Sequence, residues 1–148
     1  MACVFCEIVH DAGKGHIIYE DGSHIAFLDR YPITEGHSLV IPKRHYELIT
    51  DMTQDDTGRL FSIVPQIARA VLLATGADAF SLGQNNGRAA RQIVQHVHVH
   101  IIPRYNDRDT MWTNRGMPDD GELSDMAAKI REGLSLLERT SEPPQPPK

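Results

Sequence analysis

The sequence predicts a single α+β domain, in which a five-stranded antiparallel sheet is combined with one long helix and a C-terminal helix. Three patterns support this prediction. Residues 96–100 alternate polar and apolar side chains, which is the period of a β-strand. Asp21 and Gly22 separate two apolar runs, as in a β-hairpin. After Thr53 the apolar residues recur at helical spacing. A chain of 148 residues with 41% hydrophobic side chains is sufficient for one core, and we assign residues 1–140 to it.

The five strands are short apolar runs bounded by turn residues. The Asp21–Gly22 turn joins the first two into a hairpin, and the third follows Gly36 directly. The last two flank a polar loop with one glycine and three amide side chains. The expected strands are residues 17–20, 24–28, 37–41, 80–84 and 95–102.

The two helices have recognisable ends and apolar faces. Thr53 is the expected N-cap of the long helix, because Asp56 follows at the capping-box position, and Gly76 is its expected C-terminal residue. Pro65 lies inside this helix and predicts a kink. A second helix is expected at residues 122–139, whereas the Pro-rich residues 141–148 lack core-forming side chains and are predicted to be disordered. The long helix places these apolar residues on one face: Leu60, Ile63, Val64, Ile67 and Val71.

The charge and the N-terminal composition exclude several classes of function. A formal net charge of −5 argues against general nucleic-acid binding, which favours basic surfaces. The first residues lack the basic and apolar regions of a signal peptide, and no run reaches the length of a membrane span. We therefore expect a cytoplasmic protein that binds neither nucleic acid nor membrane.

The most informative segment contains three histidines that alternate with apolar residues. His96, His98 and His100 are expected on one face of a strand, about 6.6 Å apart from one to the next, while the intervening residues face a core. Two chemistries fit this pattern. A His-x-His pair can ligate a metal with a third ligand from elsewhere, or a neutral imidazole can act as a nucleophile toward phosphorus. The polar loop at residues 85–92 provides amides, guanidinium groups and backbone N–H groups suited to phosphate oxygens.

These residues also carry a resemblance to a known family. The run from His96 to Ile102 is similar to the His-φ-His-φ-His-φ-φ signature of the histidine triad family of nucleotide hydrolases and transferases. Phe27-Leu28-Asp29, residues 36–45 and the Asn85 loop also match family positions, so that the resemblance covers roughly residues 2–115. It implies a HIT-like fold and an enzyme that acts on the α-phosphate of a nucleotide.

The resemblance assigns a role to each matching residue. It implies that His98 is the nucleophile, which forms a nucleotidyl-histidine that water then cleaves. His100 would contact the phosphate, His37 would complete the catalytic hydrogen-bond group, and Asp29 would bind the ribose hydroxyls. From the residues alone, Asp29 also fits a turn and His37 a strand edge. The other implied contacts are Ile25 and Phe27 at the base, and Asn85 and Gln92 at the phosphate.

The implied substrate is a purine nucleoside phosphoramidate or a dinucleoside polyphosphate such as diadenosine tetraphosphate, with release of AMP. Two departures affect the leaving-group side. The family usually has Gly at position 91 and Ser, Thr or Glu at position 93, whereas this chain has Arg91 and Ile93, and Ile93 cannot donate a proton. Two alternatives therefore remain, a nucleotidyl transferase or phosphorylase and a nucleotide-binding scaffold with vestigial activity. His100 argues against the uridylyltransferase branch, which has Gln there.

The only two cysteines form a C-x-x-C pair at the N-terminus. Cys3 and Cys6 fit three interpretations: a redox pair, two reduced buried thiols, or half of a zinc site. The zinc site requires two further ligands, for which His45 and His96 are the candidates. A subset of the histidine triad family with this N-terminal pair carries such a zinc, so the resemblance favours a structural zinc bound by these four residues. Four protein ligands leave no open position for water, so this zinc would not be catalytic.

The resemblance also implies a homodimer. Family members of this type pair through the long helix and the strand after the phosphate loop, and the helix at residues 53–75 is sufficiently apolar for this role. Trp112, the only tryptophan, either covers the leaving-group side of a pocket or merely packs against the protein.

Overall fold

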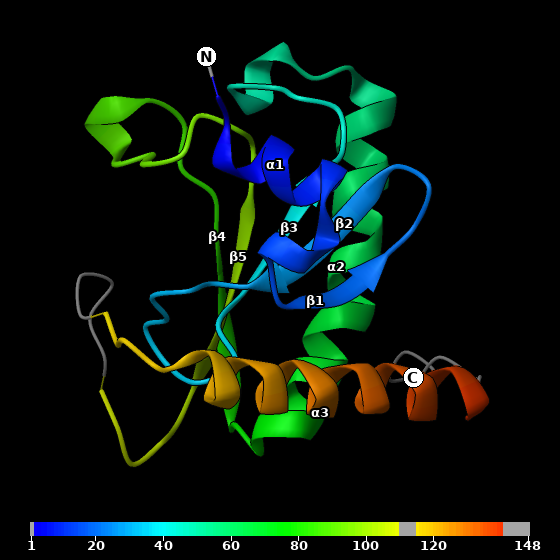
Figure 1. Ribbon diagram of the computed structural model, residues 1–148, viewed down its shortest axis with the longest axis vertical. Helices are drawn as coiled ribbons and strands as arrows, with labels where there is room; N and C mark the ends of the chain where they lie inside the picture. The colour runs from blue at the N-terminus through cyan, green and yellow to red at the C-terminus, as the bar shows by residue number, and fades with distance from the viewer. Residues whose placement is uncertain (1, 110–114, 141–148) are drawn as a thin grey trace, which may run out of the picture.

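The structure is a computed structural model, and it describes residues 2–109 and 115–140. A five-stranded antiparallel sheet forms its centre, in the order β1-β2-β3-β5-β4 (Figure 1). This confirms the predicted fold class. Trp112 and residues 141–148, for which we made predictions, lie outside the described residues. The strands are β1 (Ile17–Glu20), β2 (His24–Leu28), β3 (Ser38–Pro42), β4 (Ala79–Gly83) and β5 (Val99–Arg104).

The first two strands have the predicted bounds because a local signal fixes the hairpin. The Asp21 carboxylate accepts hydrogen bonds from the backbone N–H groups of Ser23 and His24, each at 2.8 Å, and from the Tyr19 hydroxyl at 2.7 Å. Burial alone would raise the pKa of Asp21, but these hydrogen bonds prevail and lower it to about 2. The turn is therefore stabilised by an ionised side chain.

The last strand differs from its prediction. β5 begins at Val99, where pairing with Val40 of β3 starts, and continues to Arg104, where it pairs with Ala79 of β4. His96 and His98 thus precede the strand, in the segment that leads into it, and only His100 lies within β5. Neighbouring strands set these limits, because a strand persists only where its backbone groups find partners.

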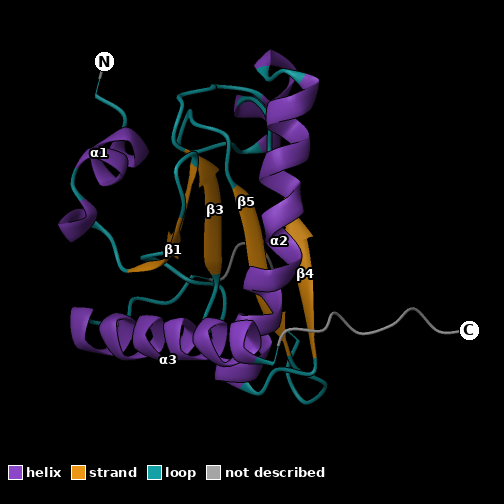
Figure 2. Cartoon of the chain, turned by 90° about the vertical axis from the view of Figure 1, so that its right-hand side faces the viewer, coloured by secondary structure: helices purple, strands orange, loops and turns teal. Residues whose placement is uncertain are grey.

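The long helix α2 (Gln54–Thr75) has the predicted ends. The Thr53 hydroxyl accepts a hydrogen bond from the backbone of Asp56 at 3.1 Å, and Gly76 adopts the left-handed conformation, with φ of 69°. The helix continues through Pro65. Helix α3 (Asp120–Arg139) packs against α2 and β1, and Figure 2 shows it across one end of the sheet. Within the described residues, we find no helix with the length and apolarity that a membrane span requires.

One helix was not predicted. Helix α1 (Val4–His10) places Phe5 and Ile8 against one face of the sheet, on the side away from α2 (Figure 2). The part of the sheet formed by β2 and β3 is therefore buried on both faces. Alternate residues of β2 and β3 belong to two separate cores, one beneath α1 and one beneath α2 and α3. The α1 core contains Phe5, Ile8, Ile25, Phe27, Leu39 and Ile41.

Candidate active site and metal-ligand cluster

A cavity of about 630 Å³ opens between α1, the end of β2 and the loop before β5. Its inner wall is apolar, and two of the three alternating histidines, His98 and His100, line it together with Asp29 and Asn85. A cavity with an apolar wall and a few convergent polar groups is typical of a small-molecule site. The apolar wall includes Phe5, Ile8, Phe27, Leu39 and Val94.

Hydrogen bonding selects one tautomer of His98. Its Nδ1 lies 2.7 Å from the carbonyl oxygen of His96, and because a carbonyl can only accept, Nδ1 carries the proton and Nε2 keeps its lone pair. The ring of Phe5 lies edge-on to the imidazole, with centroids 5.1 Å apart. Burial lowers the pKa of His98 below its ordinary value, so the ring is neutral at neutral pH. A neutral imidazole with a fixed tautomer has the properties of a nucleophile.

His37 and His100 form a second hydrogen-bonded unit. The backbone N–H of Ile33 donates to Nδ1 of His37 at 3.0 Å, so the proton of His37 lies on Nε2. This Nε2 lies 2.8 Å from Nδ1 of His100, which therefore accepts, and the proton of His100 is left on its own Nε2. Burial, followed by the neighbouring histidine and Arg115, lowers the pKa of His37 to about 2 and that of His100 to about 3. The backbone thus determines, through His37, that His100 is a neutral donor.

Asp29 is held at the edge of the cavity by backbone and by an arginine. Its Oδ1 accepts the backbone N–H of Tyr31 at 2.9 Å, and its Oδ2 accepts Nη1 of Arg115 at 3.0 Å. The same Oδ2 lies 3.6 Å from Nε2 of His37, so the carboxylate adjoins the histidine unit. We did not predict Arg115, because it is 86 residues from Asp29 and belongs to no motif.

Two predicted nucleotide-binding residues, Gln92 and Ile25, make contacts within the protein instead of lining the cavity where they were expected. The Gln92 side chain accepts the backbone N–H of Gly87 at 2.7 Å and donates to the carbonyl of Glu47 at 2.7 Å, so both ends of its amide stabilise the loop. We expected this amide at the phosphate. Ile25, expected at the base, is wholly buried in the α1 core and does not line the cavity, whereas Phe27 does.

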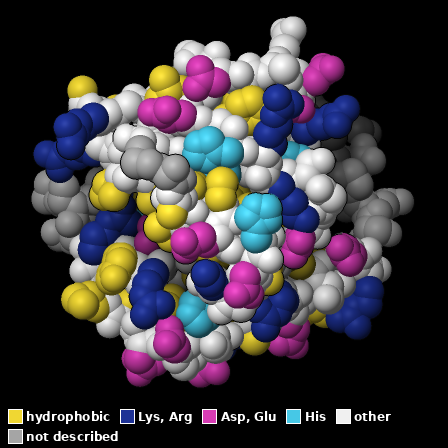
Figure 3. Space-filling view, turned by 45° about the horizontal axis from the view of Figure 1, so that its top comes forward, with side chains coloured by type: hydrophobic (Ala, Val, Ile, Leu, Met, Phe, Trp, Pro, Cys, Tyr) yellow, Lys and Arg dark blue, Asp and Glu magenta, His cyan; other side chains and the backbone are white. Residues whose placement is uncertain are grey.

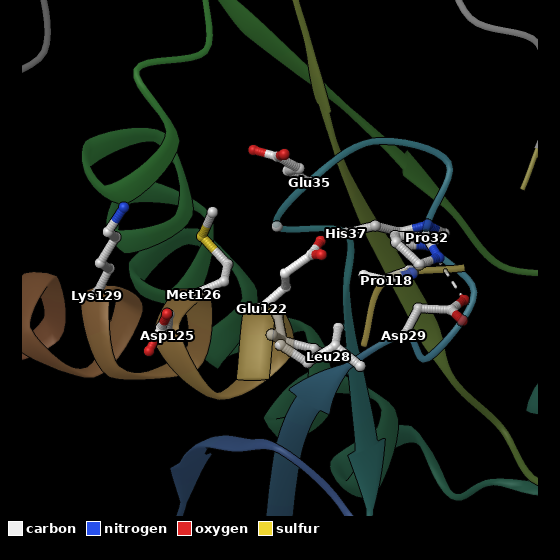
Figure 4. Close-up of a pocket in the computed structure, with 12 residues that line it drawn as sticks. Leu28, Asp29, Pro32, Glu35, His37, Pro118, Glu122, Asp125, Met126 and Lys129 are labelled. Carbon is white, nitrogen blue, oxygen red and sulfur yellow. Dashed lines mark ion pairs between the residues drawn. The ribbon is translucent and has the colours of Figure 1, made fainter. Parts of the chain in front are cut away.

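A smaller cavity of about 220 Å³ lies on the other side of the Asp29–His37 pair. Figure 4 shows it between the loop that carries Glu35 and the first turns of α3, with the Asp29–His37 contact at one end. Glu122 and Asp125 of α3 make this cavity more acidic than the first. Neither His98 nor His100 lines it, so of these two cavities the nucleophile candidate lines the larger.

The two cysteines meet two histidines at the open end of the α1 core. Sγ of Cys3 lies 3.5 Å and Sγ of Cys6 lies 3.6 Å from Nδ1 of His96, and Cys6 Sγ lies 3.3 Å from Nδ1 of His45. The two Nδ1 atoms are 3.2 Å apart. Tetrahedral zinc, with bonds of about 2.3 Å to sulfur and about 2.1 Å to nitrogen, requires ligand atoms separated by roughly 3.3–3.8 Å. The three sulfur–nitrogen distances fall in this range, the distance between the two Nδ1 atoms is 0.1 Å below it, and all four ligand atoms lie within 4.8 Å of one another, so the cluster is close to the spacing of a tetrahedral site.

The orientation of His96 also fits metal binding. Its Nε2 donates to the carbonyl oxygen of Pro42 at 2.8 Å, which leaves a lone pair on the Nδ1 that faces the sulfur atoms. The two thiols are not joined in a disulfide. His96 thus belongs to the cysteine cluster, whereas His98 and His100 belong to the cavity.

The fold and the site together are those of a histidine triad protein. The sheet has the order β1-β2-β3-β5-β4 beside α2, and the three alternating histidines are shared between the cysteine cluster and the cavity. A solved structure described as a Zn-bound histidine triad family protein from Mycobacterium smegmatis superposes with a TM-score of 0.84. It is 35% identical in sequence, and the alignment covers 95% of this chain and 99% of that one.

The sequence comparisons agree with the structural one. The HIT domain family matches residues 12–107, and the chain belongs to this family. Among its relatives, Adenylylsulfatase HINT3 of Arabidopsis thaliana is 38% identical over 140 residues, which cover 91% of this chain and 71% of the relative. Adenosine 5′-monophosphoramidase hnt1 of Schizosaccharomyces pombe is 38% identical over 111 residues, which cover 72% and 77% respectively.

Proposed function

We propose that the protein hydrolyses adenine nucleotides at the α-phosphate through a covalent nucleotidyl intermediate on His98. The observation that supports this most directly is the hydrogen bond from Nδ1 of His98 to the His96 carbonyl, since it leaves the Nε2 lone pair available in a cavity. Two relatives, an adenylylsulfatase and an adenosine monophosphoramidase, bear names of enzymes that release AMP from an adenylyl group.

The remaining cavity residues bind the parts of a nucleotide. The apolar wall with Phe27 takes the purine base, and Asp29 accepts hydrogen bonds from the ribose hydroxyls. His100 donates from Nε2 to a non-bridging phosphate oxygen, and Asn85 donates from its amide. Because His37 fixes the tautomer of His100, it is a positioning residue for the phosphate contact.

The reaction proceeds in two displacements at phosphorus. The Nε2 lone pair of His98 attacks the α-phosphorus, and the bond to the leaving group breaks with its electron pair on the departing atom. A departing nitrogen takes up a proton from solvent, whereas a sulfate or phosphate departs as the oxyanion. The ring then carries a positive charge, which the His96 carbonyl stabilises through Nδ1–H. Water attacks the same phosphorus and loses a proton to solvent, the P–N bond breaks, and its electron pair restores neutral His98. The products are AMP and the leaving group.

The test compares AMP release by the wild-type protein and by His98→Ala. We expect the wild type to release AMP from adenosine 5′-phosphoramidate or diadenosine tetraphosphate, and His98→Ala to lose at least about a thousandfold in kcat while still binding AMP. His10→Ala, at an exposed position outside the cavity, is the control. His98→Ala with more than a tenth of the wild-type rate contradicts the covalent route. AMP transferred to an acceptor other than water, or AMP bound without turnover, indicates instead the transferase or the scaffold.

We further propose that Cys3, Cys6, His45 and His96 bind a structural zinc. Their ligand-atom spacing supports this, and the bound ion would connect the N-terminus and α1 to the segment before β5. Metal analysis of the purified protein is expected to give one zinc per chain, and Cys6→Ser to give much less. A zinc-free protein with unchanged thermal stability contradicts this assignment. The reduced thiols that zinc requires are consistent with the cytoplasm, where we place the protein.

We also propose a homodimer, but with a different strand from the one we expected. β5, the strand after the phosphate loop, lies between β3 and β4, so it offers no edge to a partner. β4 is the outer strand, and its Phe80 and Leu82 are 39% and 49% exposed, next to α2, on which Phe61 and Leu73 are also exposed. Light scattering is expected to give twice the chain mass, and Leu82→Lys to reduce it toward that of one chain.

A further inference from the structure

Arg91 adopts a backbone conformation that normally requires glycine. Its φ of 63° and ψ of 38° are left-handed, and among the described residues it is the only non-glycine with positive φ. This conformation disfavours residues with a Cβ, and such strain tends to persist where the surrounding structure enforces it, often at functional sites. The side chain of Arg91 also lines the large cavity. A long cationic side chain is therefore held, at a conformational cost, in the wall of the large cavity.

The loop that carries Arg91 is braced from both sides. The Arg91 backbone N–H donates to the Arg88 carbonyl at 2.9 Å, and the Gln92 side chain connects Gly87 to Glu47. Asn86 accepts the backbone N–H of Ile49 at 2.8 Å. These hydrogen bonds fix the backbone of the loop that Arg91 shares with Asn85, the expected phosphate ligand. The guanidinium group can therefore move relative to the phosphates only by rotation about the bonds of its own side chain.

The charge of the cavity differs from that of the protein as a whole. The chain has a net charge of −5, and acidic and basic side chains intermingle on the face in Figure 3. Among the described residues, however, the cavity is lined by four Lys and Arg side chains and by one carboxylate, that of Asp29. Three of the four have acidic partners: Lys14 with Glu7, Arg30 with Asp120, and Arg115 with Asp29. The cavity cations are Lys14, Arg30, Arg91 and Arg115.

Arg91 is the exception among these cations. Within the part of the chain that the structure describes, its guanidinium has no carboxylate within ion-pair distance. The positive charge is thus available for an anionic part of a ligand. Because Asp29 and its arginine partner Arg115 mark the ribose end, while Arg91 follows Asn85 on the phosphate loop, the available charge lies on the phosphate side.

The neighbour of Arg91 points to the same kind of ligand. Ile93 also lines the cavity and is 84% exposed, and it cannot donate a proton. An amine must be protonated when it leaves phosphorus, whereas a sulfate or a phosphate leaves as a stable oxyanion that needs positive charge rather than a proton. Arg91 supplies positive charge and Ile93 withholds a proton donor, so the pair suits the second kind of leaving group.

We propose that Arg91 is a specificity-determining residue that contacts the leaving group, and that the protein prefers adenylyl compounds whose leaving group departs as an oxyanion. The proposal rests on the hydrolase function proposed above. In the first displacement the electron pair of the breaking P–O bond goes to the leaving oxygen, and the Arg91 guanidinium stabilises the charge that develops on this group.

The test measures kcat/KM for three substrates. Adenosine 5′-phosphosulfate releases sulfate, diadenosine tetraphosphate releases a phosphate oxyanion, and adenosine 5′-phosphoramidate releases an amine. We expect Arg91→Gln to lower kcat/KM for at least one oxyanion substrate, relative to the phosphoramidate, by about tenfold, and Arg91→Lys to restore part of this ratio. Arg88→Gln is the matched control, because Arg88 is exposed on the same loop and does not line the cavity; its ratio should equal that of the wild type. The two oxyanion substrates distinguish sulfate from phosphate.

A second variant separates charge from loop structure. Arg91→Gly suits the left-handed conformation, so we expect an unfolding temperature at least as high as that of the wild type together with the same loss of oxyanion preference. If the three substrates keep their wild-type ratios in Arg91→Gln, the leaving-group assignment is wrong although the hydrolase stands. If no substrate gives AMP in a His98-dependent manner, the proposed hydrolase function itself is wrong.

Discussion

The free energy of unfolding should fall steeply between pH 7.5 and pH 5.5, because buried histidines, among them His37 and His100, remain neutral in the folded protein. Burial and neighbouring positive charge lower the pKa of His37 to about 2 and that of His100 to about 3, from 6.5. In this range the unfolded chain binds protons at both rings and the folded protein does not, so a falling pH favours unfolding. The stabilisation is fully present above pH 6.5 and decreases as the pH falls below that value.

The expected size follows from the proton linkage. One pH unit below 6.5, each histidine that stays neutral costs the folded state about 1.4 kcal/mol, so the two together cost about 3 kcal/mol at pH 5.5. This is a large fraction of the 5–15 kcal/mol, roughly, by which domains are stable. Asp21 does not contribute in this window, because its lowered pKa of about 2 affects stability only below its ordinary value of 3.8.

Urea unfolding at pH 7.5 and pH 5.5 measures this difference. The wild type should lose about 3 kcal/mol or more, and His37→Gln should lose about 1.4 kcal/mol less than the wild type across the same interval. His10→Gln is the matched control, since His10 is exposed, and its loss should equal that of the wild type. A His37→Gln protein with the full wild-type pH dependence refutes the inference that His37 is buried in the neutral form.

Two further variants test the packing around the cavity. Gln92→Ala removes the two hydrogen bonds by which this side chain braces the loop, so we expect a loss of about 1–3 kcal/mol in unfolding free energy and a raised KM for nucleotide. An unchanged KM contradicts the bracing role. Gly36→Ala places a Cβ 2.5 Å from Cγ2 of Thr75, at a φ of 87°, so we expect the free energy of unfolding to fall by about 1–3 kcal/mol. Gly22→Ala is the control and should cost less, because a Cβ at Gly22 has nothing within 4 Å. Equal losses in thermal unfolding contradict this reasoning.

Elements with strong local signals were predicted most accurately. The hairpin depends on Asp21, whose side chain caps its own turn, and α2 begins and ends where Thr53 and Gly76 predict. These signals act within a few residues and are visible in the sequence. The limits of β5 depend instead on its pairing with β3 and β4, which are distant in the chain, so the strand begins after His98 rather than at residue 95.

Helix α1 shows a second limit of sequence reasoning. Its seven residues are too few for a periodic signal, and the C-x-x-C pair at its start directed attention to cysteine chemistry. The helix exists in this place because Phe5 and Ile8 cover the second face of the sheet. Only the tertiary structure shows that this face is buried.

The residues that the structure brings together at the candidate site are mainly those that belong to the histidine motif and its neighbouring segments. The structure brings together His37, His98, His100 and Asp29, as well as the four ligand candidates of the metal cluster. The Gln92 side chain instead hydrogen-bonds to the backbone of the loop, and Ile25 packs in the α1 core. Which way such a side chain turns depends on partners that no local pattern specifies.

Arg115 and Arg91 are site residues whose position could not be predicted from the sequence. Arg115 reaches Asp29 only through the fold of the chain after β5. Arg91 was visible as a departure from the family pattern, but its left-handed backbone and its place in the cavity come from the structure. Departures from a motif are therefore informative once their geometry is known.

If His98 carries the nucleotide during turnover, the adenylylated protein can be trapped and its modified residue identified. The protein is mixed with an adenylyl substrate for a time shorter than one turnover and quenched in alkali, which preserves a phosphorus–nitrogen bond. Peptide mass spectrometry then locates the adduct. We predict one adenylyl group on His98, absent from His98→Ala. AMP formed within the same interval without an adduct, or an adduct on another residue, contradicts the account.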